Sequence, residues 1–229
     1  MEQPQPQSLN ELREAVYRLL AVGFRYPTPE ALARLAAGLE SLRQAATLTP
    51  ACAIANGCAL LERFATNAAA LDGDSVLLEL GVEYCRLFVG PYRLPCPPYG
   101  SVYLDGGVVM GPSTVATLDI YASEGWQPSS CLAEPADHVA VELEFMAEMC
   151  AAAQRAAMVG DEAELARSLE TQRSFLAEHL GRWEQAFAAR VKAATTSGLY
   201  RSLAEVLEAW IPLDQDVLSA QVLALEGHG

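Results

Sequence analysis

Helix-start signals, each followed by apolar side chains three or four residues apart, recur along this chain. Ser8 and Glu11 form a capping-box pattern. Thr28-Pro29 and Thr49-Pro50 each place a capping hydroxyl before a proline at the first helical position. No segment combines sustained alternation of apolar residues with β-branched enrichment. The sequence therefore predicts an all-α protein, a single globular bundle of about nine or ten helices.

Local signals also predict where individual helices begin and end. Gly90-Pro91 ends one helix, and a later short helix is capped by Ser113 and closed by Gly125. A helix from Pro135 to Val159 is apolar on more than one side, so we expect it to be central and buried. Pro212 is expected to end the last strong helix.

Residues 90–113 interrupt this helical pattern. The stretch contains five prolines and five glycines and is too long for an ordinary connection between helices. Its aromatic and apolar side chains must pack on something, and its prolines favour a pre-formed binding wall. We therefore expect a binding loop or hinge between two helical lobes. The expected division is an N-terminal lobe at 1–89, the loop at 90–113, a C-terminal lobe at 114–213 and a tail at 214–229.

Composition narrows the class of protein. The chain is 52% hydrophobic and 19% charged, with a formal net charge of −14, which argues against nucleic acid and leaves room for a cationic partner. The N-terminus lacks the basic and apolar regions of a secretory signal. No run approaches the ~20 apolar residues of a membrane span. We expect a cytoplasmic protein without stable membrane insertion, whose cysteines, none in a C-x-x-C pair, are reduced thiols.

One histidine motif leaves two interpretations open. In Glu134-Pro135-Ala136-Asp137-His138, a proline in the first helical turn and two acids beside the positive helix N-terminus already have a structural explanation. What remains is His138, entering a mostly apolar helix. Glu134, His138 and Glu142 are spaced by four residues, which would allow an α-helical metalloenzyme site on one helix face. The other histidines supply no further ligand pair, so we expect no metal.

No catalytic signature emerges elsewhere. The glycine-rich run at 106–114 lacks the Gly-Lys-Ser/Thr core of a phosphate loop, and the only lysine of the chain is Lys192. Cys85 lies in a helical apolar stripe, as core cysteines do. We therefore expect no catalytic residues, no cofactor and no enzymatic activity.

Three runs of residues follow one another in the middle of the chain: Tyr84-x-x-Leu87-Phe88-x-Gly90-Pro91, then Pro97-Pro98-Tyr99-x-Ser101-Val102-Tyr103, then Glu134-Pro135-x-Asp137-His138. In order and spacing they resemble the motifs of the TorD/DmsD family of chaperones that mature bacterial molybdoenzymes. The pattern at 175–183, followed by Tyr200-x-x-Leu203-Ala204, resembles its C-terminal part.

The resemblance implies an all-helical cytoplasmic chaperone that binds the twin-arginine leader of a molybdopterin oxidoreductase, assists cofactor loading and holds back export. It also implies contact with the body of that enzyme, and a monomer or a domain-swapped dimer. An acidic rim would suit the leader arginines, and an aromatic groove its apolar stretch. A general helical peptide-binding scaffold remains the other alternative. By similarity, the leader-binding residues are Leu87, Phe88, Pro98, Tyr99, Ser101, Tyr103, Asp137 and His138.

Overall fold

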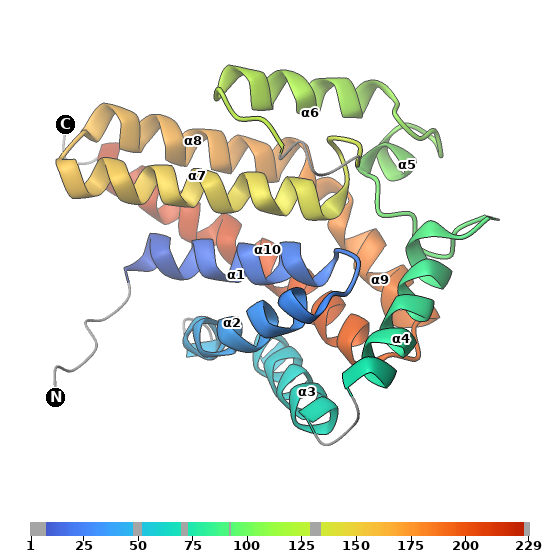
Figure 1. The fold of residues 1–229 in the computed structure, drawn as a ribbon. Coiled ribbons are helices and arrows are strands. Elements are labelled where there is room, and N and C mark those ends of the chain that lie inside the picture. Colours follow the sequence, from blue (N-terminus) through green and yellow to red (C-terminus); the bar gives the residue numbers. More distant parts are fainter. Residues whose placement is uncertain (1–7, 48–51, 70–72, 92, 129–133, 227–229) are drawn as a thin grey trace, which may run out of the picture.

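The computed structural model describes residues 8–47, 52–69, 73–91, 93–128 and 134–226, and these form ten α-helices (Figure 1). The all-α prediction is confirmed. The α-helices are α1 (Leu9–Gly23), α2 (Pro29–Thr47), α3 (Cys52–Ala69), α4 (Gly73–Tyr84), α5 (Gly100–Leu104), α6 (Pro112–Ser123), α7 (Val139–Val159), α8 (Glu162–Glu178), α9 (Glu184–Ala194) and α10 (Gly198–Glu226). A π-helix at Cys85–Val89 (η1) and a 3₁₀-helix at Leu180–Arg182 (η2) complete the list.

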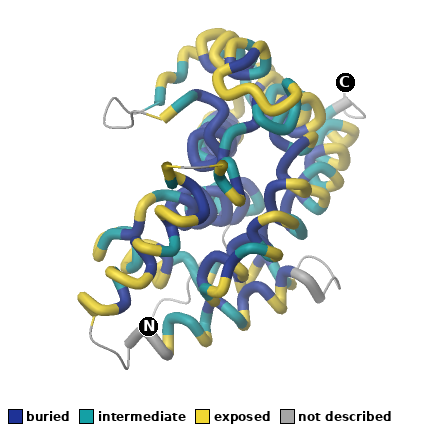
Figure 2. The backbone as a smooth tube through the Cα atoms, turned by 90° about the vertical axis from the view of Figure 1, so that its right-hand side faces the viewer, coloured by how far each residue is buried: buried dark blue, intermediate teal, exposed yellow. Residues whose placement is uncertain are grey.

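Helix α7 lies at the centre of the fold. It runs alongside α8 on one side and α1 on the other, while α10 lies behind and α2 and α3 below (Figure 1). Most of its side chains are buried around its whole circumference, as its apolar pattern predicts. Because α1 packs on α7 and α10 packs on α3, the helices before and after the proline-rich loop share one core. In the turned view of Figure 2, buried stretches run through the interior and exposed ones lie on the outer helices.

Several caps form as the sequence predicts. Glu11 N–H donates to Ser8 Oγ at 3.2 Å, and Ser8 N–H donates back to the Glu11 carboxylate at 2.9 Å. Ala31 N–H donates to Thr28 Oγ1 at 3.1 Å. Gly160 ends α7 in the left-handed conformation with φ 74°, which glycine adopts without steric cost. The start expected at Thr49-Pro50 lies outside the described residues.

The prediction that Pro212 ends the last helix was wrong. Helix α10 continues through Pro212 to Glu226, so residues 214–226, expected as a tail, are helical. Tertiary contacts offset the lost backbone hydrogen bond, because Asp214 on the next turn is buried. Its carboxylate accepts from Tyr17 Oη at 2.6 Å and from Arg13 Nη2 at 3.0 Å. Leu218 beyond it is also fully buried.

One other helix start differs from expectation, while Gly90 ends its helix as predicted. Helix α6 begins at Pro112 with Gly111 as its N-cap, and the carboxylate of Asp105, not a Ser113 cap, accepts from Ser113 N–H at 2.9 Å and from its hydroxyl at 2.6 Å. The helix that precedes Gly90 changes at Cys85 into a π-helix, with Gly90 N–H donating to Cys85 O at 2.8 Å. Single π-helical turns of this kind occur frequently at functional sites. Among the described helices, none combines the length and apolar character that a membrane crossing needs.

The buried pair of Arg13 and Asp214 should dominate the stability of this core. Asp214→Ala leaves the guanidinium of Arg13 buried and without its main partner, so the free energy of unfolding should fall by about 3–5 kcal/mol. The exposed pair of Glu40 and Arg43 supplies the control, since Glu40→Ala should cost about 1 kcal/mol or less. Urea denaturation of both variants measures the difference. Equal losses would show that the buried pair does not anchor α10 to α1.

The domain-swapped dimer stays a prediction. Light scattering of the purified protein, before and after refolding, should show a monomer with a minor dimer that exchanges slowly. One species at every concentration and after refolding would contradict it.

Candidate functional site

The two sequence motifs meet in a short antiparallel contact, which we call the clamp and define as residues 98–101 and 136–139. Gly100 N–H donates to Asp137 O, and Val139 N–H donates to Pro98 O, both at 2.8 Å. These bonds pair Tyr99 with His138 as an isolated β-bridge. The clamp ties the middle of the proline-rich loop to the start of the central helix α7.

Asp137 holds the clamp through its side chain as well as its backbone. Its Oδ2 accepts from Ser101 N–H at 2.7 Å, so the carboxylate caps the first turn of α5. Its Oδ1 is buried without a hydrogen-bond partner among the described residues. Ser101 Oγ in turn accepts from Met110 N–H at 3.2 Å. Asp137 therefore fixes the conformation of the loop from within.

His138 caps helix α7, a role that the sequence did not predict. We expected the helix to begin at Pro135, but α7 begins at Val139, and His138 is its N-cap. His138 Nδ1 accepts from Ala140 N–H at 3.1 Å, so the ring hydrogen lies on Nε2. Burial, together with the charge of Arg25, lowers the pKa of His138 to about 3. Pro135 and Asp137 form a turn before the helix, because His138 N–H donates to Pro135 O at 3.0 Å.

Glycine at position 100 allows a close approach beneath the clamp. A Cβ there would lie 3.0 Å from Trp183 Nε1 and 3.3 Å from Glu142 Oε1. Trp183 Nε1 donates to the other oxygen of Glu142 at 3.1 Å. Glu142 is buried, and this burial holds its pKa well above its ordinary value. The side chains of Glu142 and Trp183 thus lie directly beneath the clamp.

The metalloenzyme alternative fails on geometry. Glu134 precedes α7, so Glu134, His138 and Glu142 do not share one helix face, and Glu142 is already bonded to Trp183. Within the described part of the chain, no group of three His, Cys, Asp or Glu side chains is arranged to hold a metal ion.

Most of the predicted leader-binding residues lie inside the protein. Leu87 and Phe88 are buried, and the Phe88 ring packs against Tyr84, Tyr200 and Phe187 at centroid distances of 5.1, 5.5 and 6.1 Å. Pro98, Ser101, Asp137 and His138 are also buried. These six residues can therefore shape a binding surface but present little area to a partner.

Tyr99 and Tyr103 are half-buried and reach the surface. The Tyr99 ring packs edge-on against His138 at 5.5 Å. Its hydroxyl lies beside the Glu134 carboxylate; burial and this negative charge raise the pKa of Tyr99. The Tyr103 ring stacks on Trp183 at 5.4 Å, and its hydroxyl donates to Pro97 O at 2.9 Å.

Two open pockets flank the contact between Tyr99 and His138. The His138 pocket, of about 370 Å³, is lined by Arg25, Tyr26, Tyr84, Val89, Glu134, His138, Ala140 and Val141. The Tyr99 pocket, of about 480 Å³, is lined by Arg93, Leu94, Pro97, Tyr99, Val102, Gly107, Val109 and Arg190.

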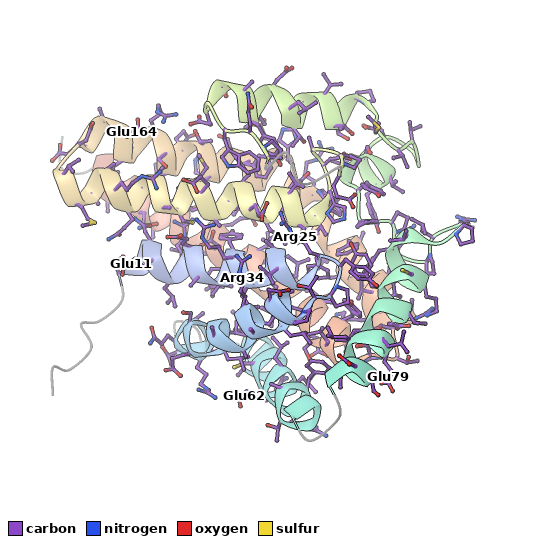
Figure 3. All side chains as sticks on the ribbon, in the orientation of Figure 1. Glu11, Arg25, Arg34, Glu62, Glu79 and Glu164 are labelled. Carbon is purple, nitrogen blue, oxygen red and sulfur yellow. The ribbon has the colours of Figure 1, made fainter. Side chains whose placement is uncertain are left out.

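The two pockets differ in charge. In the His138 pocket Arg25 forms an ion pair with Glu144, whereas Glu134 forms no ion pair with any residue that the structure describes. Figure 3 shows Arg25 beneath the start of α7, between α7 and α1. The Tyr99 pocket has only arginines as charged lining residues. The acidic rim that would suit the leader arginines stays a prediction, and Glu134 is the carboxylate that lines the His138 pocket.

The sequence did not predict that residues following α1 line the His138 pocket. Arg25 and Tyr26 directly follow α1, and Tyr26 packs edge-on against Tyr84 at 5.5 Å. Tyr26 and Val89 are 55% and 58% exposed, so they offer apolar area to a partner. Only the sequence Tyr26-Pro27 marks the turn after α1, and nothing local relates it to a motif more than 100 residues later.

Comparisons with known proteins identify the family. A family model described as nitrate reductase delta subunit matches residues 31–189, and the matching curated relatives carry the name of TorD chaperones. The chain belongs to the TorD family. It is 32% identical over 147 residues to the chaperone protein TorD of Vibrio cholerae serotype O1, covering 64% of this chain and 66% of that protein. A TorD of Shewanella pealeana is 30% identical over 162 residues, covering 67% of each chain.

A solved structure shows the same fold as this TorD-family chain. The crystal structure of a protein described as a redox enzyme maturation protein from Archaeoglobus fulgidus matches with a TM-score of 0.55 and 23% identity, covering 93% of this chain and 99% of that one. The curated match spans just under two thirds of the length of the Vibrio relatives. The resemblance noted in the sequence is thus confirmed for family and fold.

The raised pKa of Glu142 should make the stability difference between the unmodified protein and Glu142→Gln depend on pH. Burial raises the pKa of Glu142 in the native state above its value in the unfolded chain, so Glu142 destabilises the fold increasingly as pH rises above its ordinary pKa. Glu142→Gln keeps an acceptor for Trp183 and removes this cost. The variant should gain free energy of unfolding over the unmodified protein at pH 8 and lose most of that gain at pH 4.

His138 should produce the opposite dependence. Its folded pKa is about 3 against an ordinary 6.5, so the stability that depends on the neutral ring is present above about pH 6.5 and falls away as pH drops toward 3. His138→Asn keeps a capping side chain and should flatten the acid limb of a stability profile measured by urea denaturation. An unchanged acid limb would show that other groups cause the loss.

Proposed function

We propose that this chain is a non-enzymatic cytoplasmic chaperone that binds the twin-arginine leader of a molybdopterin oxidoreductase. It assists cofactor loading and holds back export of its client until the client has folded. The names of its relatives support the maturation role: TorD chaperones in Vibrio and Shewanella. The clamp and the pockets beside it supply a physical basis for leader binding.

The observation that carries the proposal is the His138 pocket. Its lining includes the exposed apolar side chains of Tyr26 and Val89. It also includes the carboxylate of Glu134, which forms no ion pair among the described residues, whereas Arg25 pairs with Glu144. A twin-arginine leader has a basic segment followed by an apolar one. The apolar segment fits against Tyr26 and Val89, while an arginine can pair with Glu134. The six buried motif residues described above fix the position of this surface from beneath.

The leader itself should show which of its two parts provides the affinity. Burial of the apolar segment removes hydrocarbon from water, whereas exposed charges contribute little net energy. Replacing two leucines of that segment with serine should therefore weaken binding more than replacing both arginines with glutamine. The glutamine peptide should also lose salt dependence, since salt screens exposed charges beyond ~10 Å at 0.1 M. Titration calorimetry at two salt concentrations measures both effects.

A scrambled leader is the control for sequence specificity. Equal affinity for the scrambled and intact peptides would reduce the protein to a general binder of apolar peptides. Absence of binding to any twin-arginine leader of a molybdoenzyme would overturn the proposal.

Variants of the His138 pocket test whether the leader binds there. Val89→Ser should weaken leader binding by about 1–2 kcal/mol if Val89 contacts the apolar segment. Val115→Ser on α6 is the matched control, because Val115 is exposed to a similar extent, 56% against 58%, and lies outside the His138 pocket. Glu134→Gln should reduce the salt dependence while changing affinity little. Equal effects of the two valine variants would place the leader elsewhere.

A further inference from the structure

The Tyr99 pocket has a charge opposite to that of the chain as a whole. The protein carries 29 acidic and 15 basic residues, yet the charged residues that line this pocket are Arg93 and Arg190. Both arginines are exposed. A cationic pocket on a strongly acidic protein creates a local potential that the surrounding surface does not share.

Neither arginine is neutralised by a carboxylate of the described chain. The ion pairs formed by the described residues include neither Arg93 nor Arg190. The Arg190 guanidinium lies over the Tyr103 ring, 5.0 Å from its centroid, and that ring also stacks on Trp183. Arg190 is thereby oriented by an aromatic stack while keeping donors for a further partner.

Exposed apolar side chains continue the pocket along the loop. Val108, Val109 and Met110 are 53%, 52% and 68% exposed, and Val109 lines the pocket. The C-terminal end of this segment is linked to the clamp, because Met110 donates its N–H to Ser101 Oγ at 3.2 Å. Contiguous exposed apolar residues beside charged ones are typical of protein interaction surfaces.

We propose that the Tyr99 pocket and the loop residues Val108–Met110 form a second docking surface, which binds an acidic, apolar polypeptide segment of a partner protein. Arg93 and Arg190 pair with carboxylates of the segment, and its apolar side chains pack on Val109 and Met110. A peptide fits better than a small anion, because only a peptide uses the apolar extension of the pocket. The proposal does not depend on leader binding: a twin-arginine segment would be repelled by these two arginines.

A pair of designed peptides tests this surface directly. The probe is a fluorescent twelve-residue peptide of leucine and aspartate, and its counterpart replaces every aspartate with lysine. The aspartate peptide should bind 1:1 in fluorescence anisotropy despite the net charge of the protein. Arg93→Gln with Arg190→Gln should weaken it at least tenfold. Val109→Ser, which leaves every charge in place, should weaken it severalfold.

The matched control is Arg34→Gln with Arg182→Gln, which removes the same charge from two other exposed arginines. It should change affinity by less than twofold, and circular dichroism should confirm that all variants stay folded. Equal weakening by the control would reduce the effect to net charge and overturn the proposal, as would no binding of the aspartate peptide. The proposal would also be overturned if millimolar phosphate displaced the peptide and Val109→Ser left the affinity unchanged. That result would indicate a small-anion site. Self-association without peptide, abolished by Arg93→Gln with Arg190→Gln, would identify a second copy as the occupant and also contradict it.

Discussion

The candidate site depends on the hydrogen bonds that Asp137 makes to the 90–113 loop. It binds the first turn of α5 at Ser101, while its own backbone pairs with Gly100. Between η1 and α6, the described residues of the loop form only the five-residue helix α5, so the loop cannot stabilise itself by its own backbone ladder. Its position comes instead from its attachment to the start of the central helix α7. A loop held in this way loses little conformational entropy when it binds a partner.

The same attachment separates two surfaces of opposite character. On the His138 side, Tyr26 and Val89 line a pocket together with the carboxylate of Glu134. On the Tyr99 side, Arg93 and Arg190 flank an exposed apolar loop. The ring contact between Tyr99 and His138 lies between the two pockets. A basic, apolar segment and an acidic, apolar segment could therefore bind this protein at adjacent positions without competing for charge.

The sequence predicted the helices well because caps and apolar spacing are local signals. Ser8 with Glu11, Thr28 and Gly160 act as their residue types indicate. Pro212 does not end its helix, because the turn that follows is held by a buried ion pair. Its partners, Arg13 and Asp214, are 201 residues apart in the chain. No local rule reports such a partner.

The same limit explains the candidate site. The motifs identified residues that belong together, and the structure does bring Tyr99, Ser101, Asp137 and His138 into one contact. Their pattern could not reveal that most of them are buried, nor that Arg25 and Tyr26 from the end of α1 complete the surface. Amide hydrogen exchange with and without a twin-arginine leader tests the central claim, that the leader lies on the His138 side of the clamp, most directly. We expect added protection at residues 25–26, 85–90 and 134–141; protection confined to α2 and α3, with those segments unchanged, would contradict it.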